Sequence, residues 1–535
     1  MREIQKNYTV TTYQDFTNPA VAANQKAALD KVRAQFGKEY DLYLNGKWVK
    51  GENGTFDSIN PSNIKEVIGT FQMASANQAK QALTDSWEAF KTWQYVPVEE
   101  RAEYLYRIAE LIQERRDEIN AWMISESGKN YLESDADLAE GIDFINYYAN
   151  EAIRLDKGME VIDTWGDINR TIYIPLGAGV SISPWNFPFA ICLGMAFAPI
   201  VAGNTVVAKP SPDTPMMGYL IAKLAEEVGL PKGVFNFITG DNMEVGETLT
   251  TDARTRFISF TGSKNVGLHI SEIAGKVQPG QKFMKRLVCE LGGKNAVIVD
   301  KDSDLEAAAT AIVQAAFGFQ GQKCSACSRA IVLEEVYEEV LAKVVAKTKA
   351  LSIGDAKDNF AVTPVVNQKA VDKIMYYIEL GKKESTLVQG GNLAKTENEG
   401  FYIEPTIFRD VDPNARIAQE EIFGPVVAFI KAKDIDHALA IANDTDFGLT
   451  GGFFSNNPET LRKAYREHHV GNLYINRKNT GALVGGQPFG GFNMSGTDGK
   501  AGGKDYLLYF LQAKSMTERP MKGVKPVLES FKFTT

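Results

Sequence analysis

The sequence predicts an α/β protein with two lobes, and three observations support this fold class. A helical pattern runs from Ala76 to about Ile153, with apolar residues three and four positions apart in ERAEYLYRIAELIQERRDEINAWM. From about residue 180, short apolar runs such as GNTVVAKP, FNFIT and RFISFTG alternate with helical stretches. A second alternating series begins near Asn295 with NAVIVD and continues through RAIVLEE, VVAFIKA and NLYIN. Such alternation is typical of parallel sheets with helices on both faces, so each series predicts one lobe, with a cleft between the two.

Length and charge narrow the class of protein. With 535 residues, 44% of them hydrophobic, the chain is long enough for two or three domain-sized cores. Its 58 basic and 67 acidic residues leave a net charge of −9, and no Lys/Arg cluster forms a stripe that could follow a phosphate backbone. We therefore expect a large enzyme or multi-domain scaffold, with no nucleic acid among its partners.

One uncharged stretch, residues 171–208, is long enough to raise the question of a membrane span. Pro175, Pro184, Pro188 and Pro199 divide it into pieces shorter than the roughly 20 apolar residues that a spanning helix needs. We interpret it as buried strand, loop and helix. The opening MREIQKNYTV lacks the apolar core of a signal peptide, and the four cysteines do not make a disulfide framework. A cytoplasmic protein without membrane partners is expected.

Two segments, residues 158–176 and those after about 508, fit neither lobe. Both are short, strand-like and apolar only at intervals. Strands that lie outside the main sheets have backbone groups to pair. These segments are therefore candidates for pairing with another subunit.

The run RFISFTGSKNVGLHISEIAG reads as strand, tight glycine turn and helix, with Gly262 to Gly267 opening the helix. Free backbone N–H groups and the positive end of the helix dipole make such a turn suitable for a phosphate. A plain glycine turn is the alternative, since this is not the G-x-G-x-x-G fingerprint. Lys209 ends the run TVVAK, at the sheet edge where open α/β proteins bind ligands. An ordinary exposed lysine is the other interpretation.

The stretch GFQGQKCSACSRA contains Cys324 and Cys327, which could form a metal site, a redox dithiol or one nucleophile with a neighbour. A structural zinc needs about four N or S ligands, and the two remaining cysteines stand alone, so no metal is expected. A thioredoxin-like dithiol usually lies in a small domain, whereas this pair lies deep in a large one. A single nucleophile is favoured, with Glu290 in CELGGKN as a carboxylate and Asn186 in SPWNFPF as an amide donor.

Seven motifs carry a family resemblance. PWNFP, AKPS, FTGSKNVG, ELGGKN, GQKCSACSR, EEIFGPV and PFGGFNMSG resemble, in their order and spacing, the NAD(P)-dependent aldehyde dehydrogenase superfamily. The resemblance implies an aldehyde dehydrogenase-like fold, with a Rossmann-type cofactor domain, an α/β catalytic domain and a small β oligomerisation element. We expect these to comprise residues 1–157 with 177–289, residues 290–507, and residues 158–176 with 508–535. It also implies a homo-oligomer, either a dimer or a multiple of dimers.

The resemblance assigns the catalytic chemistry. Cys324 matches the family's nucleophile, which attacks the aldehyde carbon to give a thiohemiacetal. The side-chain amide of Asn186 and the backbone N–H of Cys324 would hold the developing oxyanion. Glu290 matches the general base that activates water to hydrolyse the thioester left after hydride transfer. Cys327 is then a packing neighbour, and the side chain of Cys289 is expected to face away from the cleft.

For the cofactor, NAD or NADP, the resemblance implies four principal contacts. Lys209 matches the ligand of the adenosine ribose and Ser263 the contact to the pyrophosphate. Glu421 and Phe423 match the residues that hold the nicotinamide ribose and ring. Five further positions complete the expected cofactor site: Pro184, Trp185, Ser211, Gly262 and Gly267.

One position departs from the family's pattern. NAD-specific members often carry a glutamate three residues after the ribose lysine, but Pro212 occupies this place. Because an absent carboxylate removes repulsion toward a 2′-phosphate, NADP is kept as a second cofactor. His468 and His469 take no part in this chemistry. We expect them to close a helix, either exposed to solvent or interacting with its dipole.

Within the family, GFQGQKCSACSR and NLYINRKNTGALVGGQPFGGFNMSGTDGKAGG resemble most the dehydrogenases of 1-pyrroline-5-carboxylate (L-glutamate γ-semialdehyde) in proline catabolism. This implies that the small-molecule substrate is oxidised to L-glutamate, and a functional link to a proline dehydrogenase. An amino-acid head group needs donors for its carboxylate and an anion for its ammonium group. The resemblance assigns the carboxylate to Lys323, Ser325, Gly481 and Ala482, the ammonium group to Glu140, and the aliphatic middle to Phe187 and Phe489.

Two other interpretations stay open at this point. A dehydrogenase of another semialdehyde, or a generic aldehyde dehydrogenase, would keep every catalytic residue but would not need the pair Gly481 and Ala482. A non-enzymatic protein that keeps the fold, like a lens crystallin, would tolerate loss of Cys324 or Glu290. Both are present, so the sequence favours an enzyme.

Overall fold

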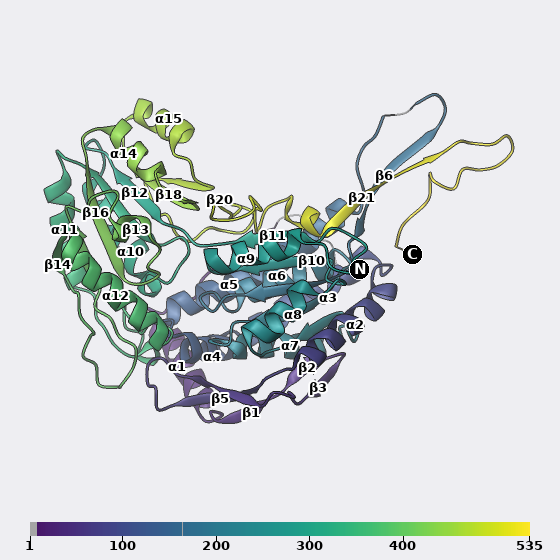
Figure 1. The fold of residues 1–535 in the computed structure, drawn as a ribbon, viewed down its shortest axis with the longest axis horizontal. Helices are drawn as coiled ribbons and strands as arrows, with labels where there is room; N and C mark the ends of the chain where they lie inside the picture. Colours follow the sequence, from purple (N-terminus) through teal and green to yellow (C-terminus); the bar gives the residue numbers. More distant parts are fainter. Residues whose placement is uncertain (1–7, 163, 535) are drawn as a thin grey trace.

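A seven-stranded sheet carries the first lobe of the computed structural model, which describes residues 8–162 and 164–534 (Figure 1). In spatial order its strands are β11 (Arg286–Glu290), β10 (Phe257–Thr261), β7 (Ala178–Ser183), β8 (Thr205–Pro210), β9 (Phe235–Phe237), β2 (Leu42–Leu44) and β3 (Lys47–Val49). The strands from β11 to β9 are parallel, so their carboxyl ends share one edge. Every residue of β8 is buried, as expected of a central parallel strand covered on both faces. The strands predicted from TVVAK and FISF are confirmed.

Helices pack around this sheet (Figure 1). Those before its parallel strands are α1 (Pro19–Arg33), α2 (Ala76–Trp93), α3 (Val98–Glu114), α4 (Arg116–Ser127) and α5 (Tyr131–Leu155), and those between strands are α6 (Ala190–Val201), α7 (Pro215–Glu227), α8 (Glu247–Thr251) and α9 (Lys264–Gly275). The helical region predicted from Ala76 to about Ile153 is confirmed. α2 begins with a capping box, in which Ser75 and Gln78 each bond the other's backbone N–H.

Helix α5 departs from the surface helices that the sequence predicted. Its buried positions include Leu138, Ala139 and Phe144, which lie on different sides of the helix. α3 packs on one side of it and α6 on another, so little of α5 faces solvent. A helix that is apolar on most sides belongs in a core, and α5 is therefore a rigid support for any side chain that it carries.

A second seven-stranded sheet forms the other lobe. In spatial order its strands are β14 (Thr386–Gln389), β15 (Thr406–Arg409), β16 (Val426–Ala432), β13 (Cys327–Leu333), β12 (Asn295–Val299), β18 (Thr450–Phe454) and β19 (Asn472–Ile475). All neighbours are parallel except β14 and β15. The associated helices are α10 (Leu305–Phe317), α11 (Tyr337–Lys349), α12 (Gln368–Glu384), α13 (Arg416–Gln419), α14 (Ile435–Asn443) and α15 (Pro458–Glu467). Two α/β lobes, as predicted, are thus confirmed.

A two-stranded antiparallel sheet stands apart from both lobes (Figure 1). β6 (Ile168–Pro175) and β21 (Leu511–Glu518) pair antiparallel along their whole length. The strands expected in the two stray segments are therefore present, and they pair with each other. Trp165, at 94% exposed, and Ile162, at 86%, lie beside β6. Exposed apolar side chains next to a narrow ribbon are typical of a surface that another subunit covers.

Smaller elements complete the fold. β1 (Lys38–Tyr40), β5 (Val67–Gln72) and β4 (Thr55–Ile59) form a three-stranded sheet, and β17 (Phe447–Gly448) pairs with β20 (Phe492–Asn493). The uncharged stretch at residues 171–208 folds into the end of β6, then β7, α6 and β8, as the sequence predicted. Along residues 8–162 and 164–534, each helix is too short or too polar to cross a membrane.

Candidate active site

A cavity of about 360 Å³ is lined by residues of both lobes and of helix α5. Nine residues singled out in the sequence line it: Cys324, Glu290, Glu140, Phe187, Lys323, Ser325, Gly481, Ala482 and Phe489. Asn186 and the nine expected cofactor residues are not part of its lining. The fold therefore brings the expected nucleophile, base and substrate contacts to one place.

Cys324 lies in a turn just before β13. The side-chain amide of Asn295 donates to the carbonyl of Cys324 (2.8 Å) and to that of Ala326 (2.9 Å). Asn479 donates to the carbonyl of Ser325 (2.8 Å). With these carbonyls held, the backbone N–H of Cys324 has no acceptor among the described residues. A free N–H beside a thiol that lines a cavity can stabilise negative charge on a bound oxygen.

The turn is preceded by strained backbone and held by neighbouring side chains. Phe319 and Gln320 in the short 3-10 helix before it are buried and have left-handed φ angles of +48° and +55°, which non-glycine residues keep only when their surroundings enforce them. Gln322 supplies one restraint, because its Oε1 accepts the N–H of Val366 (3.0 Å). Its carbonyl accepts from Nδ2 of Asn186 (3.0 Å). Asn186 thus lies next to the Cys324 turn, with a second amide hydrogen left to donate.

Glu290 ends β11 at the carboxyl edge of the first sheet. Its backbone carbonyl accepts from the N–H of Gly262 (3.1 Å), which joins it to the glycine turn after β10. Glu290 is 8% exposed, and neither carboxylate oxygen has a well-formed hydrogen bond to a residue that the structure describes, although the backbone N–H of Gly491 is close enough to act against the rise of its pKa. Burial raises the pKa of this carboxyl well above its usual range, and the Lys500 ammonium opposes that shift. A raised pKa makes this carboxylate a stronger base than an exposed one.

The electrostatic surroundings of Cys324 favour the thiol. Burial raises the pKa of Cys324 to about 12, and the carboxylates of Glu421, Glu290 and Glu140 act in the same direction. The group is therefore protonated at neutral pH. A nucleophilic thiolate therefore forms only when the thiol gives up this proton as it attacks.

Lys323 is already paired. Its ammonium group lies 2.6 Å from Oε2 of Glu133, and the two side chains are only 10% and 18% exposed. The Lys323 charge helps to lower the pKa of Glu133, although burial acts the other way. Lys323 therefore reaches the cavity as one half of an ion pair.

The two aromatic walls are fixed by contacts outside the cavity. Lys129 and Asp137 form a fully buried ion pair (2.8 Å), and the Lys129 ammonium lies 3.9 Å from the ring centre of Phe187. Phe489 exchanges two backbone hydrogen bonds of 2.8 Å with Ala501. The Phe187 ring and the backbone that carries Phe489 are thereby held in place before any ligand binds.

Glu140, on α5, is a carboxylate with no partner. It has neither an ion pair nor a hydrogen bond within residues 8–162 and 164–534, although it lines the cavity. Burial raises its pKa to about 8, the charge of Asp137 acts in the same direction, and Lys129 opposes them. An unpaired carboxylate of this kind is suited to receive a cation.

The turn at Gly481 presents backbone donors. Gly481 has a φ of +75°, a conformation that favours glycine. Arg477 donates to the carbonyls of Thr480 (3.2 Å) and Gly481 (3.1 Å). The N–H groups of Gly481 and Ala482 donate to no acceptor in the described ranges. Two free N–H groups beside a cavity form a site for an anion such as a carboxylate.

Lys209 lies in β8 at the carboxyl edge of the first sheet. The alternative of an ordinary exposed lysine is wrong, because Lys209 is 1% exposed and its ammonium donates to Oδ1 of Asn242. Burial lowers its pKa to about 8. Ser211 and Pro212 follow the strand, and the hydroxyl of Ser211 donates to Oδ2 of Asp213 (3.2 Å).

The glycine turn after β10 forms at the same edge. Ser263 is the N-cap of α9, and its hydroxyl accepts from the N–H of Val266 (3.5 Å). Ser263 itself is exposed, so it can meet a ligand. Gly267 is buried, and an added Cβ there would lie 2.3 Å from Cδ2 of Leu291. Gly267 therefore allows α9 to pack closely against the end of β11.

Glu421 and Phe423 lie where the second lobe meets the first. The carboxylate of Glu421 accepts the N–H of Gly293 (2.9 Å), and burial raises its pKa. Phe423 has a left-handed φ of +61°. Its ring meets that of Trp185 edge to face, with ring centres 5.4 Å apart. Pro184 and Trp185 follow β7, so the two lobes are in contact at this point.

His468 is the C-cap of α15, so it closes the helix as predicted, but the expectation that it is exposed or interacts with the helix dipole is wrong. It is only 6% exposed, neither ring nitrogen has a hydrogen-bond partner in the described chain, and burial lowers its pKa to about 4. The ring is neutral because burial and the charge of Arg329 disfavour its cationic form. It packs against Gly451 of β18, where an added Cβ would lie 2.4 Å from Cε1. His469 is exposed, with its ring centre 5.1 Å from that of Phe492.

The three other cysteines are not among the residues that line the cavity. All four cysteines are free thiols, and Cys192, Cys289 and Cys327 are buried. The Cys327 thiol contacts the carbonyl of Arg329 at 3.6 Å. The residues that the structure describes hold no group of three or more metal-ligating side chains.

Sequence reasoning missed several lining residues: Tyr13, Leu132, Glu133, Phe144, Tyr148, Ile191, Met195 and Lys478. A signal existed for two of them. Phe144 and Tyr148 stand four and eight positions after Glu140, so helical spacing places all three on one face. Tyr13 had no such signal, because only the tertiary fold brings the start of the chain to α5.

Comparison with known proteins decides the family. A family model described as "Aldehyde dehydrogenase family" matches residues 48–516. The chain belongs to the aldehyde dehydrogenase family. It is 53% identical over 510 residues to a 1-pyrroline-5-carboxylate dehydrogenase of Geobacillus thermodenitrificans, an alignment that covers 95% of this chain and 98% of the relative.

Solved structures agree with this assignment to the aldehyde dehydrogenase family. A Thermus 1-pyrroline-5-carboxylate dehydrogenase with bound NAD is 47% identical and has a TM-score of 0.95. The match covers 96% of this chain and 99% of the Thermus chain. Proline utilization A from Bdellovibrio bacteriovorus is 41% identical with a TM-score of 0.95, but this chain covers only 54% of it. The expected aldehyde dehydrogenase-like fold is confirmed.

Proposed function

We propose that this protein oxidises L-glutamate γ-semialdehyde, the open form of 1-pyrroline-5-carboxylate, to L-glutamate with NAD. One observation carries the proposal. The cavity that holds the thiol of Cys324 also holds an unpaired carboxylate, Glu140, and the free N–H groups of Gly481 and Ala482. An amino-acid head group offers one cation and one anion to match them. The names of the similar Geobacillus and Thermus proteins support this substrate.

The residues at the lobe junction fit a dinucleotide. The buried ammonium of Lys209 and the N-terminus of the 12-residue helix α9 lie at the carboxyl edge of one sheet, where such cofactors bind. Glu421, from the second lobe, packs directly against the backbone of Gly292, where an added Cβ would lie 2.3 Å from its Oε1. We propose that Lys209 and Glu421 hold the two riboses, Ser263 with Gly262 the pyrophosphate, and Phe423 the nicotinamide ring.

Four other residues shape the cofactor site in this proposal: Pro184, Trp185, Ser211 and Gly267. The NAD bound in the Thermus structure supports NAD as the cofactor. The chemistry that NAD supplies when bound is to accept a hydride from the adduct on Cys324, which leaves a thioester. Because Pro212 offers no carboxylate to repel a 2′-phosphate, NADP is proposed as a usable second cofactor.

In the proposed reaction, the thiol of Cys324 gives its proton to water as its sulfur attacks the aldehyde carbon to form a thiohemiacetal. The second amide hydrogen of Asn186 and the backbone N–H of Cys324 stabilise the oxygen as it gains negative charge. Each such donor typically lowers the barrier by roughly 3 to 4 kcal/mol. Both donors are held by the turn around Gln322 before substrate arrives, so little reorganisation is needed.

Glu290 then acts as the base that hydrolyses the thioester. Its carboxylate is buried and its pKa is raised, which makes it a stronger base than an exposed carboxylate, and it takes a proton from a water molecule that attacks the acyl carbon. Hydrolysis releases L-glutamate and restores the thiol. Its place at the end of β11, joined by its backbone to Gly262, keeps the base at the edge where the cofactor residues also lie.

The head group is recognised by other residues of the same cavity. In this proposal Ser325 and the N–H groups of Gly481 and Ala482 receive the α-carboxylate, and Glu140 receives the α-ammonium. Lys323 acts on the substrate as one half of its ion pair with Glu133 and not as a free cation, since its charge is already matched. Phe187 and Phe489 pack on the aliphatic carbons between the two ends.

We also propose how the chain is divided and what it assembles with. Residues 1–157 with 177–289 would form the cofactor domain and residues 290–507 the catalytic domain. Residues 158–176 and 508–535, which contain the paired strands β6 and β21, would join subunits into a dimer or a multiple of dimers. The larger protein named proline utilization A supports a functional link to a proline dehydrogenase. A cytoplasmic location agrees with four free thiols.

One assay tests the proposed function. Reduction of NAD and of NADP is measured with L-glutamate γ-semialdehyde, succinate semialdehyde and hexanal. We expect kcat/KM to be highest for glutamate semialdehyde by at least about 100-fold over hexanal, because a site with charged head-group contacts rejects an analogue that leaves them unpaired. Equal kcat/KM for hexanal would replace the proposal with a generic aldehyde dehydrogenase, and a preference for succinate semialdehyde with a dehydrogenase of that substrate.

A further inference from the structure

The start of the chain reaches the substrate cavity although it lies outside the matched family region, which begins at residue 48. Residues 8–18, here called the N-terminal segment, precede α1 and carry one cavity-lining residue, Tyr13. Tyr13 is 42% exposed and lies at the cavity with Leu132, Glu133 and Glu140 of α5. A contact made by a separate piece of chain can add selectivity to a shared catalytic site.

Buried and partly buried carboxylates hold the N-terminal segment on both sides of Tyr13. The backbone N–H and the hydroxyl of Thr11 both donate to Oδ1 of Asp143 (2.9 and 2.7 Å). The N–H of Gln14 donates to Oδ2 of Asp135 (2.7 Å), which is fully buried. Charge-assisted bonds of this length fix backbone firmly. Tyr13 is therefore positioned by the hydrogen bonds of Thr11 before it and Gln14 after it.

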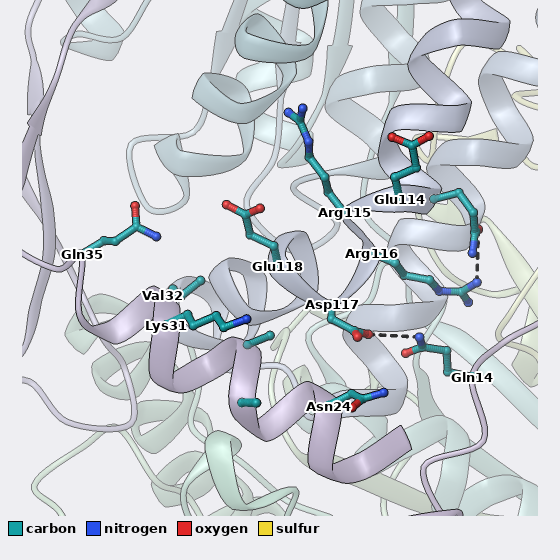
Figure 2. A pocket seen from close by; sticks show the side chains of 13 residues that line it. Gln14, Asn24, Lys31, Val32, Gln35, Glu114, Arg115, Arg116, Asp117 and Glu118 are labelled. Atoms are coloured by element: carbon teal, nitrogen blue, oxygen red, sulfur yellow. Dashed lines mark hydrogen bonds between the residues drawn. The ribbon is translucent and has the colours of Figure 1, made fainter. Parts of the chain in front are cut away.

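Further contacts extend this attachment. Figure 2 shows the side chain of Gln14 pointing to Asp117 at the start of α4, with a hydrogen bond of 3.1 Å from Nε2 to Oδ1. Edge-to-face ring pairs anchor the segment at both ends, Tyr8 on Tyr147 and Phe16 on Tyr131, each with centres 5.4 Å apart.

The anchor points follow a stripe along α5. Tyr131, Asp135, Asp143 and Tyr147 are separated by four or eight positions, and because each step of four residues turns by about 40°, the stripe winds gradually around the helix. Glu140 lies between the second and third of them in sequence. The N-terminal segment thus runs along the helix that carries Glu140, and it satisfies the neighbouring carboxylates while leaving Glu140 unpaired.

We propose that Tyr13 is a specificity-determining residue that closes the ammonium end of the substrate site over Glu140. The proposal rests on the proposed function, because it names a further contact for the α-ammonium group of the same substrate. The phenol oxygen accepts a hydrogen bond from the ammonium group, and the face of the ring attracts its charge.

The titration of Tyr13 agrees with this role. Burial raises the pKa of its hydroxyl to about 12, and the nearby carboxylates, Glu140 foremost, act in the same direction. The side chain is therefore a neutral phenol at working pH. A neutral acceptor beside a single carboxylate gives the ammonium group two partners without adding a second negative charge.

The test compares two substrates that differ only at the α-carbon. L-Glutamate γ-semialdehyde carries the ammonium group, and glutarate semialdehyde has the same length and carboxylate without it. We expect Tyr13→Phe to lower kcat/KM for the first by about three- to tenfold, the value of one lost hydrogen bond. Tyr13→Ala should lower it by more, because the ring is lost as well. Both variants should leave kcat/KM for glutarate semialdehyde within about twofold of the unaltered protein.

The matched control is Val10→Ala, on the same segment, 37% exposed and outside the cavity lining, which should change neither substrate. Melting temperature and NAD affinity identify any variant whose loss comes from misfolding. Inhibition by L-glutamate and by glutarate gives a second readout, in which Tyr13→Phe weakens only L-glutamate.

Two results would overturn the proposal. One is an equal change for both semialdehydes in the Tyr13 variants, and the other is no change for either. Failure of the proposed function is a separate result, since it would appear in the unaltered protein as poor turnover of glutamate semialdehyde relative to hexanal.

Discussion

The ammonium group of Lys323 lies 2.6 Å from Oε2 of Glu133, inside the wall of the cavity that holds Cys324. The side chains are 10% and 18% exposed, so most of both charges is hidden from water. Lys323 is adjacent to the nucleophile in sequence, and Glu133 is on α5. The pair therefore ties the Cys324 turn to the helix that carries Glu140.

We expect Lys323→Met and Glu133→Gln each to lower the melting temperature, because each leaves the other charge poorly solvated and unpaired. Removing one partner of a buried pair typically costs about 3 to 5 kcal/mol, and the partial exposure here favours the lower end. The double variant should recover most of the loss. Thermal melts of the four proteins give the coupling, with the exposed pair of Arg462 and Glu459 as the control.

The opposite pattern would make Lys323 a free cation for the substrate. In that case Lys323→Met would raise KM for glutamate semialdehyde, Glu133→Gln would lower it, and the melting temperatures would not change. Purely additive losses in the melts would also contradict the coupling.

The two cysteines of the CSAC stretch should differ sharply. Cys324→Ala is expected to abolish turnover while NAD still binds, because no other thiol lines the cavity. Cys327→Ser should keep at least about a tenth of the activity, since the Cys327 thiol only contacts a backbone carbonyl in β13. Steady-state rates and NAD titration by fluorescence measure both. An active Cys324→Ala protein would mean that the nucleophile lies elsewhere.

Replacement of Glu290 should separate the two halves of the reaction. Glu290→Gln is nearly isosteric but cannot take a proton, so we expect reduced cofactor to form in a burst and turnover then to stall at the thioester. Rapid-mixing absorbance follows the burst, and mass spectrometry of the quenched protein detects the acyl group on Cys324. A uniform slowing without a burst, and without acylated protein, would remove Glu290 from the hydrolysis step.

The sequence predicts the local elements of the fold, but spacing along the chain does not predict which distant residues meet in the cavity. The strands around Lys209 and Gly262 follow from short apolar runs and a glycine turn, and the structure has them there. The gathering of Glu140, Cys324 and Gly481 followed only from the family resemblance, because spacing along the chain says nothing about such distant contacts.

Contacts between residues that are far apart in sequence explain which site residues the sequence did not predict. Lys323 and Glu133 stand 190 positions apart, and Tyr13 meets α5 through Thr11 and Gln14, whose partners lie more than 100 positions away. The burial of His468 was missed for a similar reason, since a glycine on a neighbouring strand makes room for the ring. Local periodicity predicts elements, whereas these contacts depend on how elements pack.

The pH dependence of ligand binding should identify Glu140. Burial raises its pKa to about 8, so below pH 8 the group is mostly protonated and must lose that proton to pair with an ammonium ligand. We expect the inhibition constant of L-glutamate to fall as pH rises from 6 to 8, by an amount approaching about tenfold per unit, and to level off above 8. The amine of L-glutamate stays protonated throughout this range. Glutarate, which lacks it, should show no such fall, and Glu140→Gln should abolish the fall for L-glutamate while the protein still melts normally. Parallel profiles for L-glutamate and glutarate would show that Glu140 does not receive the ammonium group.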